Sequence, residues 1–345
     1  MDFISNYMLF FSKIFTTILL VLLSTVIFFN IVRKKNQKNF KLDIISLNDH
    51  YESIKNQIFF SMMSKYEKKI WKKNHKKKKK EKLKSDIQFV KKNHYQLFYK
   101  KKPTLYVLDF KGNINATEVT SLREEISAIL LVYQEKDEVL LRLESGGGVV
   151  NGYGLAASQL KRLREKNIHL TISVDKIAAS GGYMMACVAN HIMGSAFSVI
   201  GSIGVIAQIP NFYKLLKKNN IDMELHTSGN YKRTLTMFGE NTSEDRKKFC
   251  SELHSTHTLF REFVHDMRPS LNIEKVSNGK YWFGTTALKK GLIDSISTSD
   301  DFIMSKIKHF SILQLKYVQH KTTLVSLFLK VIKSIKNITC KMLNI

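Results

Sequence analysis

Three short segments of the chain carry the residue types that nucleophilic catalysis needs. Residues 144–148 end in three consecutive glycines, whose backbone N–H groups can approach a ligand oxygen closely and form an oxyanion hole. Ser180 lies between small residues, in Ala-Ala-Ser-Gly-Gly-Tyr, where its hydroxyl can project into a cleft. Residues 228–233 contain Lys232. Taken singly, these patterns are also typical of an ordinary turn, a capping serine and a surface lysine.

A serine nucleophile needs a base that removes its proton. No G-x-S-x-G elbow surrounds Ser180, and no histidine lies between His191 and His226, which disfavours a Ser/His/Asp site. A lysine can serve instead where burial lowers its pKa, because desolvation penalises the charged form. Spacing alone does not separate such a base from a surface lysine in a chain this rich in lysine.

The elements that must position these segments alternate between strands and helices. Strands are predicted at residues 105–110, 138–143, 170–174, 191–193, 203–207 and 223–227. Helices are predicted at residues 117–133, 151–166, 212–218 and 243–267, with a Gly-Gly turn and a small-residue helix at 178–189. Repeated βα units predict a largely parallel sheet with helices on its faces. The glycine run and Ser180 then follow strand ends, where open α/β sheets place their sites.

Residues 184–206 are apolar enough to suggest a membrane span inside this region. Asn190, His191 and several serines and glycines interrupt the segment, and polar groups at that density are costly in lipid. We therefore assign residues 184–206 to the buried core of the α/β domain.

The formal charge of +26 lies in the flanks of the chain. Residues 33–102 hold 23 basic and 6 acidic side chains, residues 303–345 hold 8 basic and no acidic ones, and residues 103–302 hold 23 and 22. A nearly neutral centre excludes a basic globular core built to grip nucleic acid. Three widely spaced cysteines form neither a disulfide framework nor a zinc pattern, and we expect no metal or other cofactor.

Residues 14–32 contain no charged side chain, and a helix of this length can cross a bilayer core about 30 Å thick. No basic region precedes them and no small-residue cleavage site follows, so we expect a retained single-span anchor rather than a signal peptide. Arg33, Lys34 and Lys35 follow the span, while Lys13 alone precedes it. The positive-inside rule then places the C-terminal side in the cytoplasm.

Residues 65–102 contain 17 lysines and no arginine. This tract is expected either to bind anionic lipid headgroups, at about 1 kcal/mol per basic residue near the surface, or to form a solvated linker. Without arginine and regularly spaced aromatic residues, specific nucleic-acid binding is not expected. Residues 324–345 repeat apolar side chains at helical spacing between lysines, which is typical of a helix on a membrane or packed on protein.

Residues 105–302 resemble the S49 serine peptidases, the signal peptide peptidase A family. The motifs that carry the resemblance are LDFKGNINATEVTSLREEI, LRLESGGG, NGYGLAASQLKRLR, VDKIAASGGYMMACVAN, GSIGV, YKRTL, FGENTSEDRKKF, MRPSLNIEKV and GLID. The N-terminal span and the lysine-rich tract are also similar to members of this family. The resemblance implies a ClpP/crotonase-like α/β fold, assembly into homo-oligomeric rings in which neighbours complete the cleft, and a single-pass protein of the bacterial inner membrane. Peptidases of this family often act on the side of the membrane opposite to the cytoplasm, so the side of the catalytic domain stays open.

By motif, the resemblance implies that Ser180 is the nucleophile, Lys232 the general base and Ser202 the residue that orients the lysine. The implied activity is endopeptidase hydrolysis of peptide bonds in signal-peptide remnants or misfolded membrane-associated proteins. Four segments follow: a membrane anchor (1–35), a lysine-rich juxtamembrane linker (36–102), a catalytic domain (103–305) and a basic, partly amphipathic extension (306–345).

The same resemblance assigns the oxyanion hole to Gly147 and Gly148, with the backbone N–H of Gly181 as a further donor. Gly146 stands where the family usually has proline. The exchange removes a fixed φ and raises the entropy of the unfolded loop, so we expect a looser oxyanion hole.

Two other classes of function remain open. A crotonase-type acyl-CoA enzyme would share the oxyanion hole but would not need Ser180. A catalytically weak or inactive membrane scaffold would use the basic flanks to bind lipid or nucleic acid.

Overall fold

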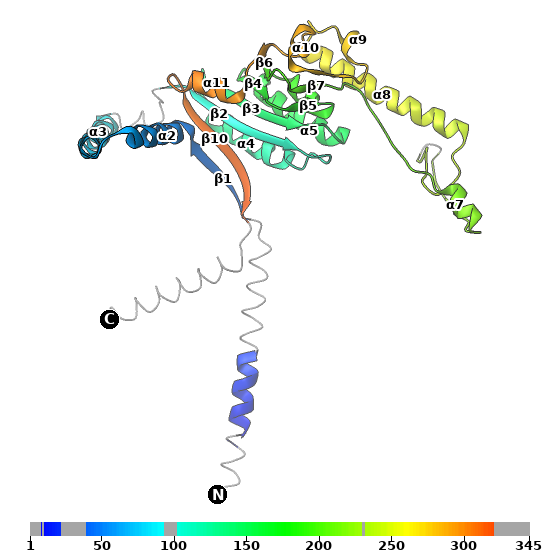
Figure 1. Cartoon of the computed structure of the whole chain (residues 1–345). Helices are drawn as coiled ribbons and strands as arrows, with labels where there is room; N and C mark the ends of the chain where they lie inside the picture. The colour runs from blue at the N-terminus through cyan, green and yellow to red at the C-terminus, as the bar shows by residue number, and fades with distance from the viewer. Residues whose placement is uncertain (1–7, 9, 22–38, 93–101, 230–231, 321–345) are drawn as a thin grey trace. The chain divides into compact units, whose positions relative to one another are not determined.

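The computed structural model describes residues 8, 10–21, 39–92, 102–229 and 232–320 (Figure 1). The chain divides into two compact units, one of residues 44–316 and one of residues 1–43 together with 317–345. Residues 10–21 are helical, with exposed side chains. In the described part of the chain no helix combines the length and the apolar character that a membrane crossing requires. The span predicted at 14–32 lies partly outside these residues, and the helix predicted at 324–345 lies wholly outside them.

The described strands form one ten-stranded sheet in which neighbours are mostly parallel. Its main path runs through β1 (Asn39–Ser46), β10 (Ser311–His320), β2 (Thr104–Gly112), β3 (Glu138–Ser145), β4 (His169–Val174), β6 (His191–Gly194) and β9 (Ser295–Ile296). From β3 a branch leads through β5 (Ile177–Ala179) and β7 (Val199–Gly201) to β8 (Tyr281–Phe283), and β8 runs antiparallel to β7. The predicted α/β class with a largely parallel sheet is confirmed.

The helices predicted at 117–133, 151–166, 212–218 and 243–267 are present to within two residues at each end, and the helix predicted within 178–189 is shorter, at Gly181–Ala186. Those of the unit 44–316 are α2 (Leu47–Met62), α3 (Lys65–Lys92), α4 (Val119–Val132), α5 (Val150–Glu165), α6 (Gly181–Ala186), α7 (Tyr213–Lys218), α8 (Ser243–Met267), α9 (Ile273–Val276), α10 (Gly284–Lys289) and α11 (Ser299–Lys306). From the sequence, Thr242 or Ser243 can cap the start of α8, but Ser243 with Arg246 three residues later does not form a full capping box. The structure has the full box one residue earlier, because Thr242 and Asp245 exchange hydrogen bonds.

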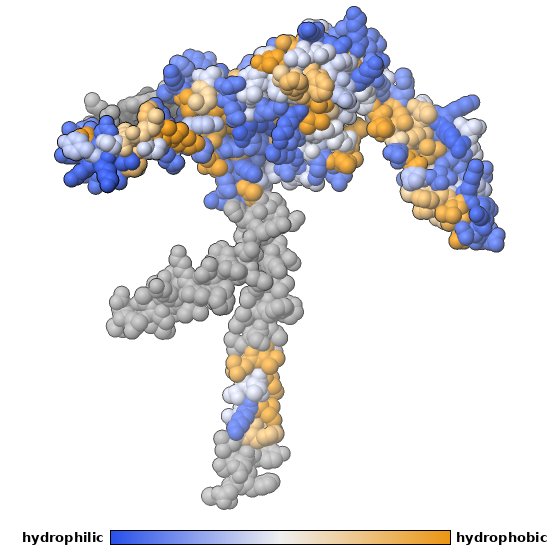
Figure 2. Space-filling model, in the orientation of Figure 1, coloured by the Kyte–Doolittle hydropathy of each residue, from blue (hydrophilic) through white to orange (hydrophobic). Residues whose placement is uncertain are grey.

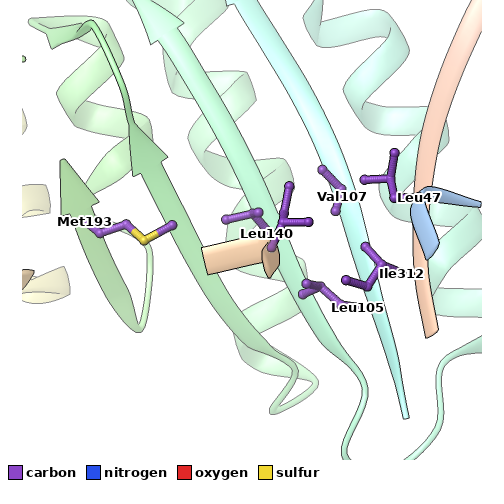
Figure 3. Close-up of a cluster of buried hydrophobic side chains, with 7 residues drawn as sticks. Leu47, Leu105, Val107, Leu140, Met193 and Ile312 are labelled. Atoms are coloured by element: carbon purple, nitrogen blue, oxygen red, sulfur yellow. The ribbon is translucent and has the colours of Figure 1, made fainter. Parts of the chain in front are cut away.

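Successive side chains of β2 point to opposite faces of the sheet and pack in two different apolar layers. Phe110 lies edge-on to Tyr153 of α5, with ring centroids 6.4 Å apart. Leu105 and Val107 join a second buried cluster, completed by Leu47, Leu140, Met193, Ile303 and Ile312 (Figure 3). Burying each such side chain stabilises the fold by about 1.5–3 kcal/mol, so the sheet is held from both faces.

Two predicted strands are absent. Residues 203–207 and 223–227 have no regular secondary structure, and nearly all of residues 206–229 are exposed. Their apolar residues suit a strand, but a strand needs a neighbour for its N–H and C=O groups, and the sheet offers none there. The strand in this region is β7 instead, at Val199–Gly201. Of residues 184–206, which the sequence assigns to the buried core, 184–189 are buried and most of 191–205 are buried or half-buried. Asn190, Phe197 and Ile206 are exposed, so the assignment is only partly confirmed.

Candidate active site

Ser180 lies between β5 and α6 in an unusual backbone conformation. Its φ of 52° and ψ of −119° place a residue with a side chain in the left-handed half of the map. The backbone N–H donates to Gly201 O at 2.8 Å, which ties this turn to the end of β7. Ser180 is the N-cap of α6, yet its side chain makes no capping hydrogen bond. The interpretation of Ser180 as a capping serine is therefore wrong, and the hydroxyl is left for other contacts.

The glycine run after β3 passes directly over Ser180. Gly147 has a φ of +89°, and a Cβ there would lie 2.7 Å from both the Ser180 Cβ and the Gly181 N. A Cβ on Gly148 would overlap the carbonyl of Ile114 on the other side of the turn. Only glycine therefore lets this backbone lie against the serine, as a loop that binds an oxyanion beside the nucleophile must.

The N–H of Gly147 has a partner inside the protein. It donates to Ser145 Oγ at 3.1 Å. Of the predicted oxyanion-hole residues, the structure thus brings Gly147, Gly148 and Gly181 together beside Ser180, with the Gly147 N–H turned to a buried serine. Gly146 differs from its neighbours, because a Cβ there would meet only Ile177 Cδ1 at 3.9 Å.

A small cavity of about 70 Å³ opens beside Ser180. Its lining combines Ser180 and three glycines with mostly apolar side chains: Gly148, Gly181, Gly204, Val150, Met184, Val205, Ile206, Thr256 and Phe260. A peptide side chain seated there would meet hydrocarbon, and α8 supplies part of the wall through Thr256 and Phe260.

Ser202 follows β7 and lies close to the turn that carries Ser180. Its φ is 52°, and its N–H donates to Lys280 O at 2.8 Å. Since Ser180 N–H binds the carbonyl of Gly201, the preceding residue, the two predicted site serines are held together through the backbone.

Lys232 is not beside Ser180 in this chain. Its side chain is exposed and does not line the cavity, and its backbone N–H donates to Gly229 O at 3.2 Å. It belongs to a segment that carries α7 and that we call the arm, described at residues 205–229 and 232–241. Local contacts shape the arm, with the Phe212 and Phe238 rings stacked at 6.0 Å between centroids.

An ion pair that is only partly buried follows α8, with the Arg268 side chain 10% exposed and the Asp294 side chain 30% exposed. Arg268 donates to both oxygens of Asp294, at 3.0 and 2.6 Å, and to Gly291 O. Burial alone would raise the pKa of Asp294, but the hydrogen bonds from Arg268 and from Ile192 N–H lower it below its ordinary value. Burial raises the pKa of Cys187, within the same core, to about 12, so this thiol stays protonated and chemically inert.

The geometry of this region combines a strained serine at a strand-to-helix turn with a glycine turn laid against it. Two family models match the chain, "Peptidase family S49 N-terminal" over residues 2–160 and "Peptidase family S49" over residues 162–312. The chain therefore belongs to peptidase family S49, and it is a peptidase.

Individual relatives agree with this family. The chain is 68% identical over 306 residues to "Probable protease SohB" of Buchnera aphidicola subsp. Schlechtendalia chinensis, covering 89% of this chain and all of the relative. It is 53% identical to the protein of the same name from Buchnera aphidicola subsp. Schizaphis graminum, over 100% of this chain and 98% of the relative. Among solved structures, ClpP1 from Listeria monocytogenes matches 58% of this chain and 93% of its own, at 10% identity and a TM-score of 0.37.

Proposed function

We propose that the chain is a serine endopeptidase in which Ser180 is the nucleophile and Lys232 the general base. The observation that carries the proposal is the backbone at Ser180, strained at a φ of 52° and covered by Gly147. Backbone strain of this kind costs on the order of 1–3 kcal/mol and persists at sites where function needs it.

In the proposed mechanism, neutral Lys232 takes the proton from Ser180 Oγ, and the oxygen attacks the carbonyl carbon of a peptide bond. The N–H groups of Gly148 and Gly181 stabilise the oxyanion. Lys232 then gives the proton to the leaving amine, and a water molecule hydrolyses the acyl-enzyme while the lysine accepts its proton. Ser202 would orient the lysine, which family membership supports.

The exposed position of Lys232 leads us to propose that a second copy of the chain supplies it. The arm exposes large apolar side chains without cover: Ile206, Ile209, Leu215, Ile221, Met223 and Leu225. Such a surface is typical of a contact between proteins. Docking on a neighbour would also withdraw the lysine from water, which penalises the charged form of an amine.

The first experiment is labelling with a serine-reactive probe on intact and on permeabilised cells, which also reports the membrane side of the site. Wild type is expected to label, Ser180→Ala to lose the label, and Ser158→Ala, a change on the surface of α5, to keep it. Full peptidase activity in purified Ser180→Ala would overturn the proposal, and would instead favour the crotonase-type alternative.

A mixing experiment tests the shared site. Ser180→Ala and Lys232→Ala are each expected to lower kcat/KM roughly a thousandfold or more. Oligomers that contain both variants should regain activity if the base comes from a neighbour. Mixtures as inactive as their parts would show that the dyad forms within one chain.

The apolar cavity supports a substrate with an apolar side chain before the cleaved bond. Val150, Met184 and Phe260 supply the hydrocarbon of its lining. Signal-peptide remnants and misfolded membrane-associated proteins fit this chemistry. A fluorogenic peptide series that varies only this residue should favour Ala and Leu over Asp and Lys. Equal rates for all four would contradict the assignment.

We further propose a membrane location, the bacterial inner membrane, with residues 14–32 as a single-pass anchor. α3 supports it, because its sequence has 14 lysines against three acidic residues, which suits an anionic lipid surface. α2 presents Ile54, Ile58 and Met62 to solvent beside it. The full chain should stay in the membrane pellet after alkaline carbonate extraction. Release into the supernatant would contradict the anchor.

A further inference from the structure

A chain of three hydrogen bonds starts at the glycine turn and crosses the protein behind Ser180. Gly147 N donates to Ser145 Oγ at 3.1 Å, Ser145 Oγ lies 2.6 Å from Tyr153 Oη, and Tyr153 Oη lies 2.7 Å from Asn113 O. The four groups come from the end of β3, the turn after it, the first turns of α5 and the loop after β2. One line of contacts therefore joins the loop after β2 and the turn after β3 to α5.

The direction of every bond in this chain follows from the chemistry of the groups. A carbonyl oxygen only accepts, so the single proton of Tyr153 goes to Asn113 O. The hydroxyl of Ser145 must then donate to Tyr153, which leaves its lone pairs to accept the N–H of Gly147. Burial raises the pKa of Tyr153, so the phenol keeps its proton. Aligned hydrogen bonds in a buried site strengthen one another.

Both hydroxyl residues are buried in contact with the turn that carries Ser180. Tyr153 is 0% exposed and Ser145 is 2% exposed. A Cβ on Gly181 would overlap the Tyr153 ring, and a Cβ on Gly182 would lie 2.5 Å from Ser145 O. The same two residues thus touch the turn that carries Ser180 and hold the turn that lies over it.

We propose that Ser145 and Tyr153 are positioning residues, which orient the turn 146–148 by engaging the Gly147 N–H and thereby present the Gly148 N–H to the substrate. The inference rests on the proposed function. Without the chain, the Gly146–Gly147 peptide plane is free to rotate and the donor at Gly148 moves with it. Neither side chain touches the substrate or the reacting atoms.

The test compares kcat and KM of Tyr153→Phe, Ser145→Ala and the double variant with wild type, in the full chain on one peptide. Each single variant should lower kcat roughly 10- to 100-fold at nearly unchanged KM, because an angstrom of misplacement is that costly. The double variant should lose little more than either single variant, since both break the same chain.

Tyr183→Phe is the matched control. Tyr183 is also 0% exposed, and its hydroxyl also donates to one backbone carbonyl, Leu292 O at 2.9 Å. Both Tyr→Phe variants should lower the unfolding temperature by similar amounts, but only Tyr153→Phe should lower kcat.

Three results would overturn the inference: wild-type kcat in Tyr153→Phe and Ser145→Ala, an effect confined to KM, or an equal loss of kcat in Tyr183→Phe. Ser180→Ala in the same assay separates this outcome from failure of the proposed function. If Ser180→Ala is inactive while Tyr153→Phe and Ser145→Ala are fully active, only the positioning role fails. If Ser180→Ala is active, the proposed function fails with it.

Discussion

The two halves of the proposed dyad lie in regions built in opposite ways. Residues 178–189 around Ser180 are buried except for the serine itself, which is only partly exposed. Residues 206–229, which lead to Lys232, are exposed except for Tyr213 and Leu216. Both regions are rich in apolar side chains. The region around Ser180 is therefore packed within one chain, whereas the arm leaves its apolar side chains exposed, as a surface for a partner would.

Glycines in the two regions should respond differently to the same substitution. Gly147 and Gly229 both have a positive φ, of +89° and +98°, but a Cβ at Gly229 meets nothing within 4 Å. Gly147→Ala adds a clash with Ser180 and should cost about 1–3 kcal/mol of stability and roughly 100-fold in kcat. Gly229→Ala should cost at most about 1 kcal/mol. Chemical denaturation and peptide hydrolysis measure both, and equal effects would contradict the comparison.

A charge on the arm should break assembly and leave the fold of the chain intact. Leu215 on α7 is 57% exposed, so Leu215→Glu removes no buried contact but places a carboxylate on the proposed interface. Sedimentation should show smaller oligomers with lower activity and an unchanged unfolding temperature. Leu131→Glu, at a leucine 85% exposed on α4, is the control and should assemble normally. Dissociation by the control alone would place the interface elsewhere.

The ion pair in the core should contribute more to stability than the ion pair on the arm. Asp294→Asn removes the carboxylate that binds the mostly buried guanidinium of Arg268 and should lower the stability of the core by about 1–2 kcal/mol at neutral pH. Asp222→Asn removes the partner of Lys217 on the exposed arm and should change nothing measurable.

The pH dependence follows from the lowered pKa of Asp294. Its stabilising effect is fully present above its ordinary value of 3.8 and is lost as the pH falls through the lower folded value. In acid, Asp294→Asn should therefore converge on wild type in urea denaturation. A stability difference between Asp294→Asn and wild type that widens as the pH falls would contradict this prediction.

The smallest expected effect concerns Gly146, where the family usually has proline. Space is open at this position and its φ lies outside the left-handed region. Gly146→Pro should therefore stabilise the chain by about 0.4–1 kcal/mol by restricting the unfolded loop. Thermal unfolding checks it, and a large loss of stability would show that the turn needs a conformation closed to proline.

Sequence patterns predicted the helices and most strands well, because these depend on local periodicity. They failed at residues 203–207 and 223–227, where apolar runs have no strand to pair with. They also missed Tyr153, which resembles any apolar residue on the inner face of α5. The sole signal was a hydroxyl at a buried position, since such a group must find a partner.

The sequence by itself determined the family, the βα order and the residues that resemble a Ser-Lys site, since motifs and periodicity are local properties of the chain. The tertiary structure decided the strained turn at Ser180, the glycine run laid against it and the separation of Lys232 from both. Those features arise from contacts between residues far apart along the chain, such as Ser180 with Gly147 and Tyr153 with Asn113. No short stretch of sequence encodes such a contact alone.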